Sequence, residues 1–194
     1  MTTWWHEERL RAVVAVLRDS GAARVLDLGC GAGDLILPLL DLPQITHITG
    51  VELDRARLET LRTRLPAGGD RVRLVQGSIT TATPALAGFD AAALVEVIEH
   101  LDRADLAAME RAVFGTFRPG IVVVTTPNAE FNRLLGVPAR RFRHPGHRFE
   151  WTRAQFRAWA GAVATRHGYH VDHADIGGAH PDLGGTSQMA VFAR

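Results

Sequence analysis

Hydrophobic residues fall into two kinds of segment along this chain. Short, nearly continuous apolar runs alternate with longer stretches in which apolar and charged residues recur at helical spacing. The short runs predict strands, at residues 24–28, 46–51, 71–76, 89–95, 121–125, 169–174 and 188–193. The longer stretches predict helices, at residues 5–18, 35–40, 55–65, 103–117 and 152–166.

This order of elements predicts an α/β fold. Strands that alternate with helices form an open, mostly parallel sheet. The last two strands, which are joined by a short connection, predict an antiparallel hairpin at the edge of that sheet. Residues 129–150 have no periodic pattern and are expected to be irregular. Ligands of such sheets bind beyond the carboxyl ends of the strands, so residues that follow the first five strands are expected to converge there.

Length, charge and cysteine content narrow the class of protein. A chain of 194 residues is expected to form one domain, residues 1–194. No apolar run reaches the roughly 18 residues that span a membrane, and the charged segment MTTWWHEERLR does not resemble a signal peptide. The single cysteine, Cys30, fits a reducing cytoplasm. The net charge is only +1, although every basic residue is an arginine, so there is no global nucleic-acid signature.

A glycine-rich turn with the sequence GCGAGD, residues 29–34, follows the first predicted strand directly. A dinucleotide fingerprint would have a third glycine where this chain has Asp34, which would bring a carboxylate close to a pyrophosphate. A carboxylate suits the positively charged amino-acid end of S-adenosylmethionine better, and Glu52 can accept hydrogen bonds from both ribose hydroxyls. We therefore expect S-adenosylmethionine as cofactor. The expected contact residues are Asp27, Gly29, Gly31, Glu52, Leu53, Ser78 and Ile79.

These residues resemble the class I S-adenosylmethionine-dependent methyltransferases, which have a Rossmann-like fold. The resemblance covers nearly the whole chain. It implies a seven-stranded sheet whose last strand is antiparallel, but it identifies only the cofactor and not the acceptor of the methyl group.

The segment VEVIEHL, residues 95–101, follows the fourth strand and is the first candidate for an acceptor site. If a helix begins here, Glu96, Glu99 and His100 share one face, because their spacings are i, i+3 and i+4. Two carboxylates and an imidazole could form half of a divalent-metal site. The alternative is that Glu99 and His100 only cap and pack a helix, since many methyltransferases without a metal carry a similar segment.

The stretch RFRHPGHRFEWTR, residues 141–153, is the second candidate. It contains His144 and His147, and six arginines stand against one acid, Glu150, between residues 133 and 153. Long loops of this kind are usually functional, and a solvated basic loop is the alternative. We expect these arginines to bind phosphates, at positions 133, 140, 141, 143, 148 and 153. Phe142 or Trp151 could stack on a base, although each is also a candidate for the core.

Four segments are similar to the methyltransferase domain of the HEN family, which methylates the 2′-hydroxyl of the 3′-terminal ribose of small RNAs. They are VEVIEHL, VVVTTPNAEFN, RHPGHRFEWTRAQFRAWA and SQMAVF, and they run in order from residue 95 to the C-terminus. The family usually has an acidic residue where Gly146 stands and often a tyrosine in place of Phe131. The resemblance implies the same reaction here, with residues 129–151 as the substrate and metal loop.

The resemblance also implies a divalent metal, Mn²⁺ or Mg²⁺, bound by Glu96, Glu99, His100 and His147. His147 is preferred to His144 because it adjoins the FEWT core of the motif. A bound cation would lower the pKa of a ribose hydroxyl, and imidazole ligands favour Mn²⁺. Glu96, His100 and His144 are the expected catalytic residues, with His144 as an acid–base group or an RNA contact.

Two other functions stay open at this point. A small-molecule O- or C-methyltransferase of the same fold could use the basic loop for an acidic substrate. A non-catalytic module could bind S-adenosylmethionine or dock on RNA. Bacterial members of the family often act with a polynucleotide kinase–phosphatase in RNA repair. The expected partners are therefore an RNA 3′ end and an RNA-repair kinase–phosphatase or ligase, and no membrane. Residues 125–128 and Asn132 are weaker candidates for the wall of a terminal-nucleotide pocket.

Overall fold

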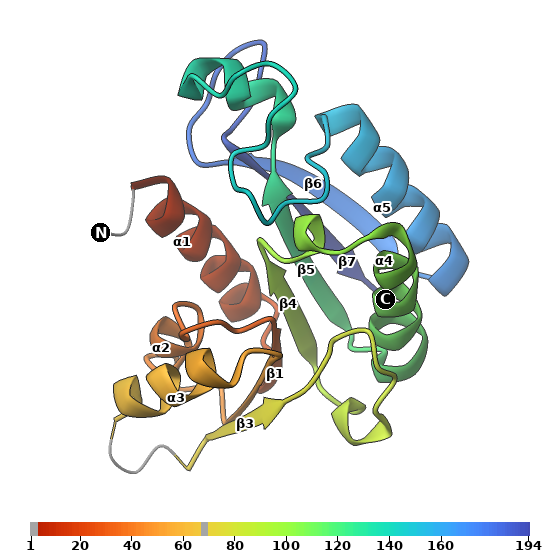
Figure 1. Cartoon of the computed structure of the whole chain (residues 1–194). Coiled ribbons are helices and arrows are strands. Elements are labelled where there is room, and N and C mark those ends of the chain that lie inside the picture. Colours follow the sequence, from red (N-terminus) through yellow and green to blue (C-terminus); the bar gives the residue numbers. More distant parts are fainter. Residues whose placement is uncertain (1–3, 67–69) are drawn as a thin grey trace.

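The computed structural model describes residues 4–66 and 70–194, so that residues 1–3 of the charged N-terminal segment lie outside it. A seven-stranded sheet lies at its centre (Figure 1). The strands are β1 (Arg24–Leu28), β2 (His47–Glu52), β3 (Val72–Gln76), β4 (Ala91–Val95), β5 (Ile121–Pro127), β6 (His170–Ile176) and β7 (Ser187–Ala193). The α-helices are α1 (Trp4–Asp19), α2 (Ile36–Leu39), α3 (Arg55–Arg64), α4 (Arg103–Glu110) and α5 (Arg153–His167). Shorter helical segments are η1 (Pro84–Leu86), η2 (Ile98–His100), η3 (Arg111–Phe117) and η4 (Ala129–Leu135).

The strand order is β3-β2-β1-β4-β5-β7-β6. The first five strands are parallel, and β7 lies antiparallel between β5 and β6. This confirms the predicted α/β fold and the antiparallel pair at the edge. The connection between β6 and β7 is longer than expected, since it covers residues 177–186. The chain reverses its direction of winding between β1 and β4, which makes the carboxyl ends of these strands the expected ligand crevice.

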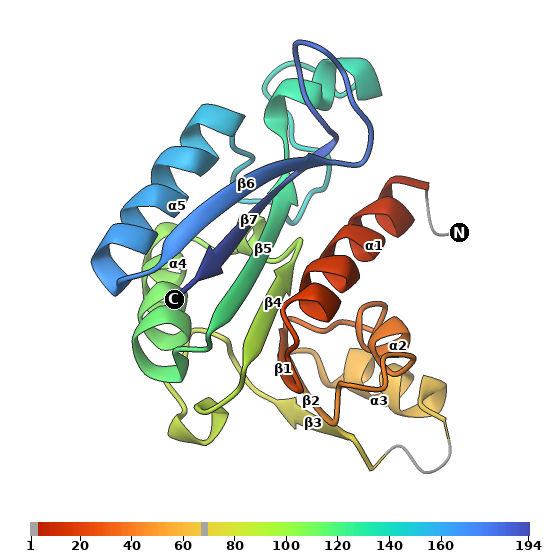
Figure 2. The same ribbon diagram turned by 180° about the vertical axis from the view of Figure 1, so that it is seen from behind.

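Helices cover both faces of the sheet. Figures 1 and 2 show α1, α2 and α3 on one face and α4 and α5 on the other. The central strands are therefore buried on both sides, and successive residues contribute to different cores. Val25 packs with the α1–α3 layer, whereas Leu26 packs with the α4 and α5 layer. This double burial explains why the strands read as continuous apolar runs.

Side-chain caps define where three of the helices begin. Asp54 accepts the N–H of Ala56 at the start of α3, and Asp102 caps α4 in the same way. At α5, Thr152 and Gln155 form a capping box, which satisfies two backbone donors reciprocally. No helix in the two described ranges, 4–66 and 70–194, has the length and apolar character needed to cross a membrane.

The backbone departs from the expected helix after β4. Glu96 has a φ of +54°, and Val97 has a φ of −121°, so the helical turn includes only residues 98–100. The N–H of Glu96 still donates to the carbonyl of Thr125 at 3.1 Å, as if the strand continued. The spacing argument that placed Glu96 on a helix with Glu99 and His100 is therefore wrong. The expectation of irregular structure is also wrong for residues 129–135, which form η4.

Candidate active site

Two glycines of the turn after β1, Gly29 and Gly33, are packed too closely to carry a side chain. Gly29 and Gly33 have φ values of +84° and +87°, which glycine adopts readily. A Cβ on Gly29 would lie 2.7 Å from a methyl carbon of Val97, and one on Gly33 would lie 2.2 Å from Cδ1 of Leu61. The N–H of Gly29 donates to the carbonyl of Val51 at 2.8 Å. The turn is therefore fixed between β2, α3 and the residues after β4.

Two adjoining cavities, of about 310 and 250 Å³, lie along this turn and share Gly29, Arg57 and Glu96 in their walls. All residues expected at the cofactor line one or both cavities. The first cavity contains Asp27, Gly29 and Gly31, and the second contains Gly29, Glu52, Leu53, Ser78 and Ile79. Their combined volume falls in the range of small-molecule sites, about 300–1,000 Å³. The structure brings these residues together, and their role as cofactor contacts stays a prediction.

Two carboxyl groups in these walls have contrasting environments. Glu52 is held by backbone donors, because its two oxygens accept the N–H groups of Gly31 and Asp54, each at 2.9 Å. Asp27 is 2% exposed, and its Oδ2 has no hydrogen-bond partner among the described residues. Burial, together with the charges of Glu52 and Asp34, raises the pKa of Asp27 to about 7. A buried carboxyl group without a partner fits a ligand that carries a positive charge.

Asp34, which favoured S-adenosylmethionine over a dinucleotide, also lines the first cavity. One of its oxygens lies 2.7 Å from Arg64 Nη1, and the other lies 3.4 Å from His6 Nε2. The protein thus neutralises part of the charge of Asp34. The argument that a carboxylate at position 34 favours S-adenosylmethionine over a dinucleotide is weaker for that reason. Asp27 is now the carboxyl group that best supports a positively charged ligand.

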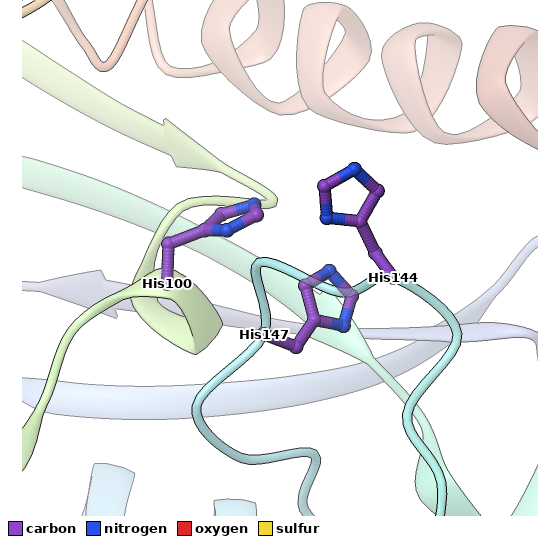
Figure 3. A group of neighbouring side chains, drawn as sticks. All are labelled: His100, His144 and His147. Carbon is purple, nitrogen blue, oxygen red and sulfur yellow. The ribbon is translucent and has the colours of Figure 1, made fainter.

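Three histidines form a cluster next to the second cavity, and Figure 3 shows their rings facing one another. His100 comes from η2, whereas His144 and His147 come from the loop 129–151. One nitrogen from each ring lies within 4.8 Å of the other two. The ring centroids of His100 and His147 are 4.9 Å apart. Two segments that are distant in the sequence therefore meet at imidazole groups, which are common metal ligands.

The hydrogen bonds of the rings distinguish His144 from the other two histidines. His100 Nδ1–H donates to the carbonyl of Gly146 at 3.2 Å, and His147 Nδ1 lies 2.5 Å from Glu150 Oε1. Nε2 is then the nitrogen that each ring can offer to a metal. Burial lowers the pKa of His100, which favours the neutral ring that a metal requires. In contrast, His144 Nδ1 accepts the N–H of Gly146 at 3.0 Å, so the neutral ring carries its proton on Nε2.

Within the described residues, neither of the two predicted carboxylate ligands belongs to the 4.8 Å group, so the structure does not bring all four predicted ligands together. Glu99 is fully buried; its Oε2 accepts from the Thr126 hydroxyl at 3.0 Å, and its Oε1 has no hydrogen-bond partner in the described part of the chain. Burial and the charge of Glu96 raise the pKa of Glu99 well above its usual range. Glu96 Oε1 lies 3.2 Å from the Thr125 hydroxyl and 3.3 Å from Arg9 Nε. Two imidazoles and a buried carboxylate oxygen without a partner fit a divalent cation.

Comparison with known proteins agrees with this geometry. Residues 25–120 match a family described as a methyltransferase domain. The chain is 35% identical over 203 residues to a small RNA 2′-O-methyltransferase from Gallus gallus, covering 97% of this chain and 54% of that protein. The crystal structure of the methyltransferase domain of a bacterial Hen1, CtHen1-CN, matches with a TM-score of 0.89 and 39% identity, over 98% of this chain and 100% of that chain. The crystal structure of the small RNA methyltransferase HEN1 matches with a TM-score of 0.90 and 33% identity, over 98% of this chain and 26% of that chain.

The chain belongs to the Hen1 methyltransferase family. The resemblance seen in the sequence is thereby confirmed, as is the class I methyltransferase fold. The chain spans about half the length of the curated vertebrate relatives that it matches.

In this Hen1-family chain, His147 is held by a network that the sequence analysis missed. Glu150 accepts from the Asn132 amide at 2.6 Å and from the Arg143 N–H at 2.7 Å, in addition to its contact with His147. Burial raises the pKa of Glu150, but these three hydrogen bonds outweigh burial and lower it overall. A carboxylate behind an imidazole ligand fixes its tautomer and orientation. The signal was present in the sequence, since Glu150 is the single acid of an arginine-rich stretch and stands three residues after His147.

Two of the six arginines expected to bind phosphates are used inside the protein instead. The Arg143 guanidinium donates to Asn132 Oδ1 and to the backbone carbonyls of Asn128 and Thr186. Arg153 donates to Glu130 at 2.8 Å and 3.1 Å. The other four are exposed, at positions 133, 140, 141 and 148. The phosphate-binding expectation is therefore wrong for Arg143 and Arg153 as they are placed here.

The structure places Phe142 and Trp151 in different environments. Phe142 is 46% exposed, whereas Trp151 stacks on Phe149 with ring centroids 4.3 Å apart and packs against the core. Phe142 is the one of the two that could reach a base. Asn128, a candidate for a pocket wall, is fully buried and donates to two carbonyls of the segment before β7, so its role is structural.

Proposed function

We propose that this chain transfers a methyl group from S-adenosylmethionine to the 2′-hydroxyl of the 3′-terminal ribose of RNA, and that it requires a divalent metal. The position of His100 carries the proposal. His100 lines the second cofactor cavity and also belongs to the histidine cluster. A methyl donor in the cavity and a metal at the cluster would be neighbours. Membership of the Hen1 family supports RNA 2′-O-methylation, and the site supports the metal.

The residues of the cofactor half would divide the binding task. Glu52 keeps lone pairs for ribose hydroxyls while its backbone hydrogen bonds fix the carboxylate. Leu53, which is 70% exposed, would pack on the adenine, and Ser78 and Ile79 would meet the adenine edge. Asp27 would face the positively charged methionine end. S-adenosylmethionine supplies an electrophilic methyl group when bound.

Glu96, Glu99, His100 and His147 would hold the metal. A divalent cation supplies a lowered pKa for a coordinated hydroxyl. The protein's own contribution is to keep Nε2 of His100 and His147 available, since hydrogen bonds occupy Nδ1 of both rings. Imidazole ligands favour Mn²⁺ over Mg²⁺. A free terminal cis-diol offers two oxygens, which would select an RNA 3′ end.

We assign His144 to RNA contact in preference to proton abstraction. A general base needs a free lone pair within hydrogen-bond reach of the proton. The Nδ1 lone pair of His144 accepts the N–H of Gly146, so the ring presents Nε2–H as a donor. A phosphate or ribose oxygen could accept from it.

The loop 129–151 would serve as the substrate and metal loop of a single methyltransferase domain, residues 1–194. Its exposed arginines would bind phosphates without sequence preference, and Phe142 would stack on a base. A cytoplasmic location and an RNA-repair kinase–phosphatase or ligase partner stay predictions.

Mass spectrometry of the 3′-terminal nucleoside tests this function directly. An RNA oligonucleotide is incubated with S-adenosylmethionine and Mn²⁺, next to matched oligonucleotides with 2′-deoxy and 3′-deoxy ends. We expect a 2′-O-methyl nucleoside only at the terminus of the unmodified RNA, and none with EDTA. Methylation that persists in EDTA contradicts the metal, and methylation at internal positions contradicts end selection. Turnover of small acidic molecules without RNA methylation would favour the small-molecule alternative.

A further inference from the structure

We propose that Arg9 of α1 is a positioning residue for Glu96, and that α1 thereby links the cofactor cavity to the metal cluster. The inference rests on the proposed function, in which Glu96 is a metal ligand. It concerns a helix far from both motifs in the sequence, to which the preceding assignments give no part in the reaction.

Arg9 is sheltered and faces Glu96 directly. Its Nε lies 3.3 Å from Glu96 Oε1 and 3.3 Å from the hydroxyl of Ser187 in β7. The side chains of Arg9 and Glu96 are only 13% and 20% exposed. Solvent screens such a pair less than a surface ion pair, so the guanidinium holds the carboxylate in a defined orientation.

The backbone of Glu96 makes this orientation necessary. A non-glycine residue with a φ of +54° persists only where its surroundings hold it. The Glu96 N–H is held by Thr125 of β5, and the Thr125 hydroxyl donates to Glu96 Oε1 at 3.2 Å. Arg9 of α1 contacts the same oxygen of Glu96. Among the described residues no hydrogen bond uses Oε2, which is the oxygen left for a cation.

The same helix also forms part of the cofactor cavity. His6 and Leu10 line the first cavity together with Glu96. The start of α1 is fixed from behind, since Trp5 lies edge-on to Phe131 of η4 at 6.0 Å, and a Cβ on Gly178 would come within 2.7 Å of the Trp5 ring. A ligand that fixes the position of α1 therefore also fixes the position of Arg9.

Arg9 acts on a cation in two opposing ways. Its positive charge repels a metal, whereas its contact with Glu96 orients that carboxylate toward the metal. Because Glu96 neutralises Arg9 at 3.3 Å, the net repulsion between Arg9 and the metal is small. We therefore expect the orientation of Glu96 by Arg9 to have the larger effect on metal affinity. Outer partners of metal ligands typically contribute about 10–100-fold in metal affinity.

Titration of Mn²⁺ into the whole chain tests the proposal, with free Mn²⁺ measured by electron paramagnetic resonance in the presence of S-adenosylhomocysteine. We expect Arg9→Ala to weaken Mn²⁺ binding about 10–100-fold and Arg9→Lys to recover part of it. Arg11→Ala is the matched control, because Arg11 lies on the same helix, is 64% exposed and pairs with Glu7 and Glu8. Circular dichroism checks the fold of each variant, and Arg9→Lys carries the test if Arg9→Ala unfolds.

A double-mutant cycle shows whether Arg9 acts through Glu96. In a Glu96→Gln background, Arg9→Ala should cause no further loss of Mn²⁺ affinity. S-adenosylhomocysteine should tighten Mn²⁺ binding in the wild-type chain by the same factor as Mn²⁺ tightens cofactor binding, and Arg9→Ala should remove this coupling. Unchanged or tighter Mn²⁺ binding in Arg9→Ala, or an equal loss in the Glu96→Gln background, overturns the role of Arg9. A wild-type chain that binds no Mn²⁺ instead refutes the metal site of the proposed function itself.

Discussion

The two halves of the candidate active site are built in different ways. In the cofactor half, the turn of residues 29–34 and Glu52 are placed by backbone hydrogen bonds and by glycines that leave no room for a Cβ. In the metal half, which is the part proposed to bind a cation, His100 and His147 come from distant segments. The Glu150 side chain orients His147, and the backbone carbonyl of Gly146 holds His100. The cofactor half should therefore be sensitive to changes of backbone conformation, and the metal half to loss of single side-chain contacts.

Substitution of His147 should give the largest effect and should leave the cofactor half intact. Without its imidazole, we expect RNA methylation to fall about 1,000-fold, or about 4 kcal/mol, because the proposed metal would lose a ligand. The metal-free affinity for S-adenosylhomocysteine should stay within about twofold, since His147 itself lines neither cofactor cavity. Initial rates and calorimetry measure the two quantities for His147→Ala.

His170→Ala is the matched control, because this histidine is 76% exposed on the edge strand β6. It should behave as wild type. His144→Ala should lose less activity than His147→Ala, if His144 contacts RNA rather than the metal. Near-normal activity of His147→Ala would remove His147 from the ligand set.

A methyl group on Gly33 should break the cofactor half through the backbone. Its Cβ would lie 2.2 Å from Cδ1 of Leu61, which is fully buried, and its φ is +87°. We expect Gly33→Ala to lower the free energy of unfolding by about 2–4 kcal/mol and to weaken binding of S-adenosylhomocysteine. Urea denaturation and calorimetry measure these effects.

Gly21→Ala separates the conformational part of that cost from the steric part. Gly21 has a similar φ of +69°, but a Cβ there would meet no atom within 4 Å, so the loss should be only about 1 kcal/mol. Equal losses at the two positions would show that packing against Leu61 is unimportant.

Much of the fold could be predicted because its signals are local. Strands such as 91–95 and 121–127 are buried on both faces and therefore read as apolar runs whatever packs on them. The glycine turn is also local, since Gly29 needs both a positive φ and the space of a missing Cβ. The antiparallel pairing of β6 with β7 was predicted from their connection and from the family resemblance, whereas the place of β7 between β5 and β6 was not predicted.

The site could be predicted only in part, because tertiary contacts set its backbone. The left-handed turn at Glu96 depends on Thr125 of another strand, and no spacing rule applied within residues 95–101 could reveal it. Arginine composition predicted a phosphate-binding loop, with a solvated basic loop as the alternative. The Arg143 guanidinium instead donates to backbone carbonyls of the protein. Whether a basic or aromatic side chain points inward is decided by its neighbours in space, as the contrast between Phe142 and Trp151 shows.

Substitution of Glu150 should sharpen the comparison, since it changes one contact behind His147, a proposed metal ligand. Glu150→Gln removes the negative charge that holds His147 Nδ1. We expect Mn²⁺ affinity and methylation to fall about 10–100-fold, without change in cofactor affinity. Glu130→Gln is the control, because Glu130 pairs with Arg153 and makes no hydrogen bond to the histidines within the described chain. If both variants lose Mn²⁺ affinity equally, the loop acts as one rigid unit and Glu150 has no special role.

The smallest effect should appear in the pH dependence of stability, and it belongs to the cofactor half. The pKa of Asp27 is raised to about 7 by burial, whereas an unfolded chain loses this proton near pH 4. The folded chain thus binds the extra proton between about pH 4 and 7, and its stability should fall as pH rises through that window. Thermal melts of the ligand-free chain should show a shallower fall for Asp27→Asn.

Glu99 makes this measurement a comparison of the two halves. Its pKa is also raised, by burial and by Glu96, so it contributes a slope of the same sign from the metal half. Glu99→Gln should flatten the melts as well, but only Asp27→Asn should remove the proton release that accompanies binding of the positively charged cofactor below about pH 7. Calorimetry in buffers of different ionisation enthalpy measures that release. If Asp27→Asn released as many protons on cofactor binding as the wild-type chain, the proton would come from another group. Asp27 would then not pair with the positive charge of the cofactor.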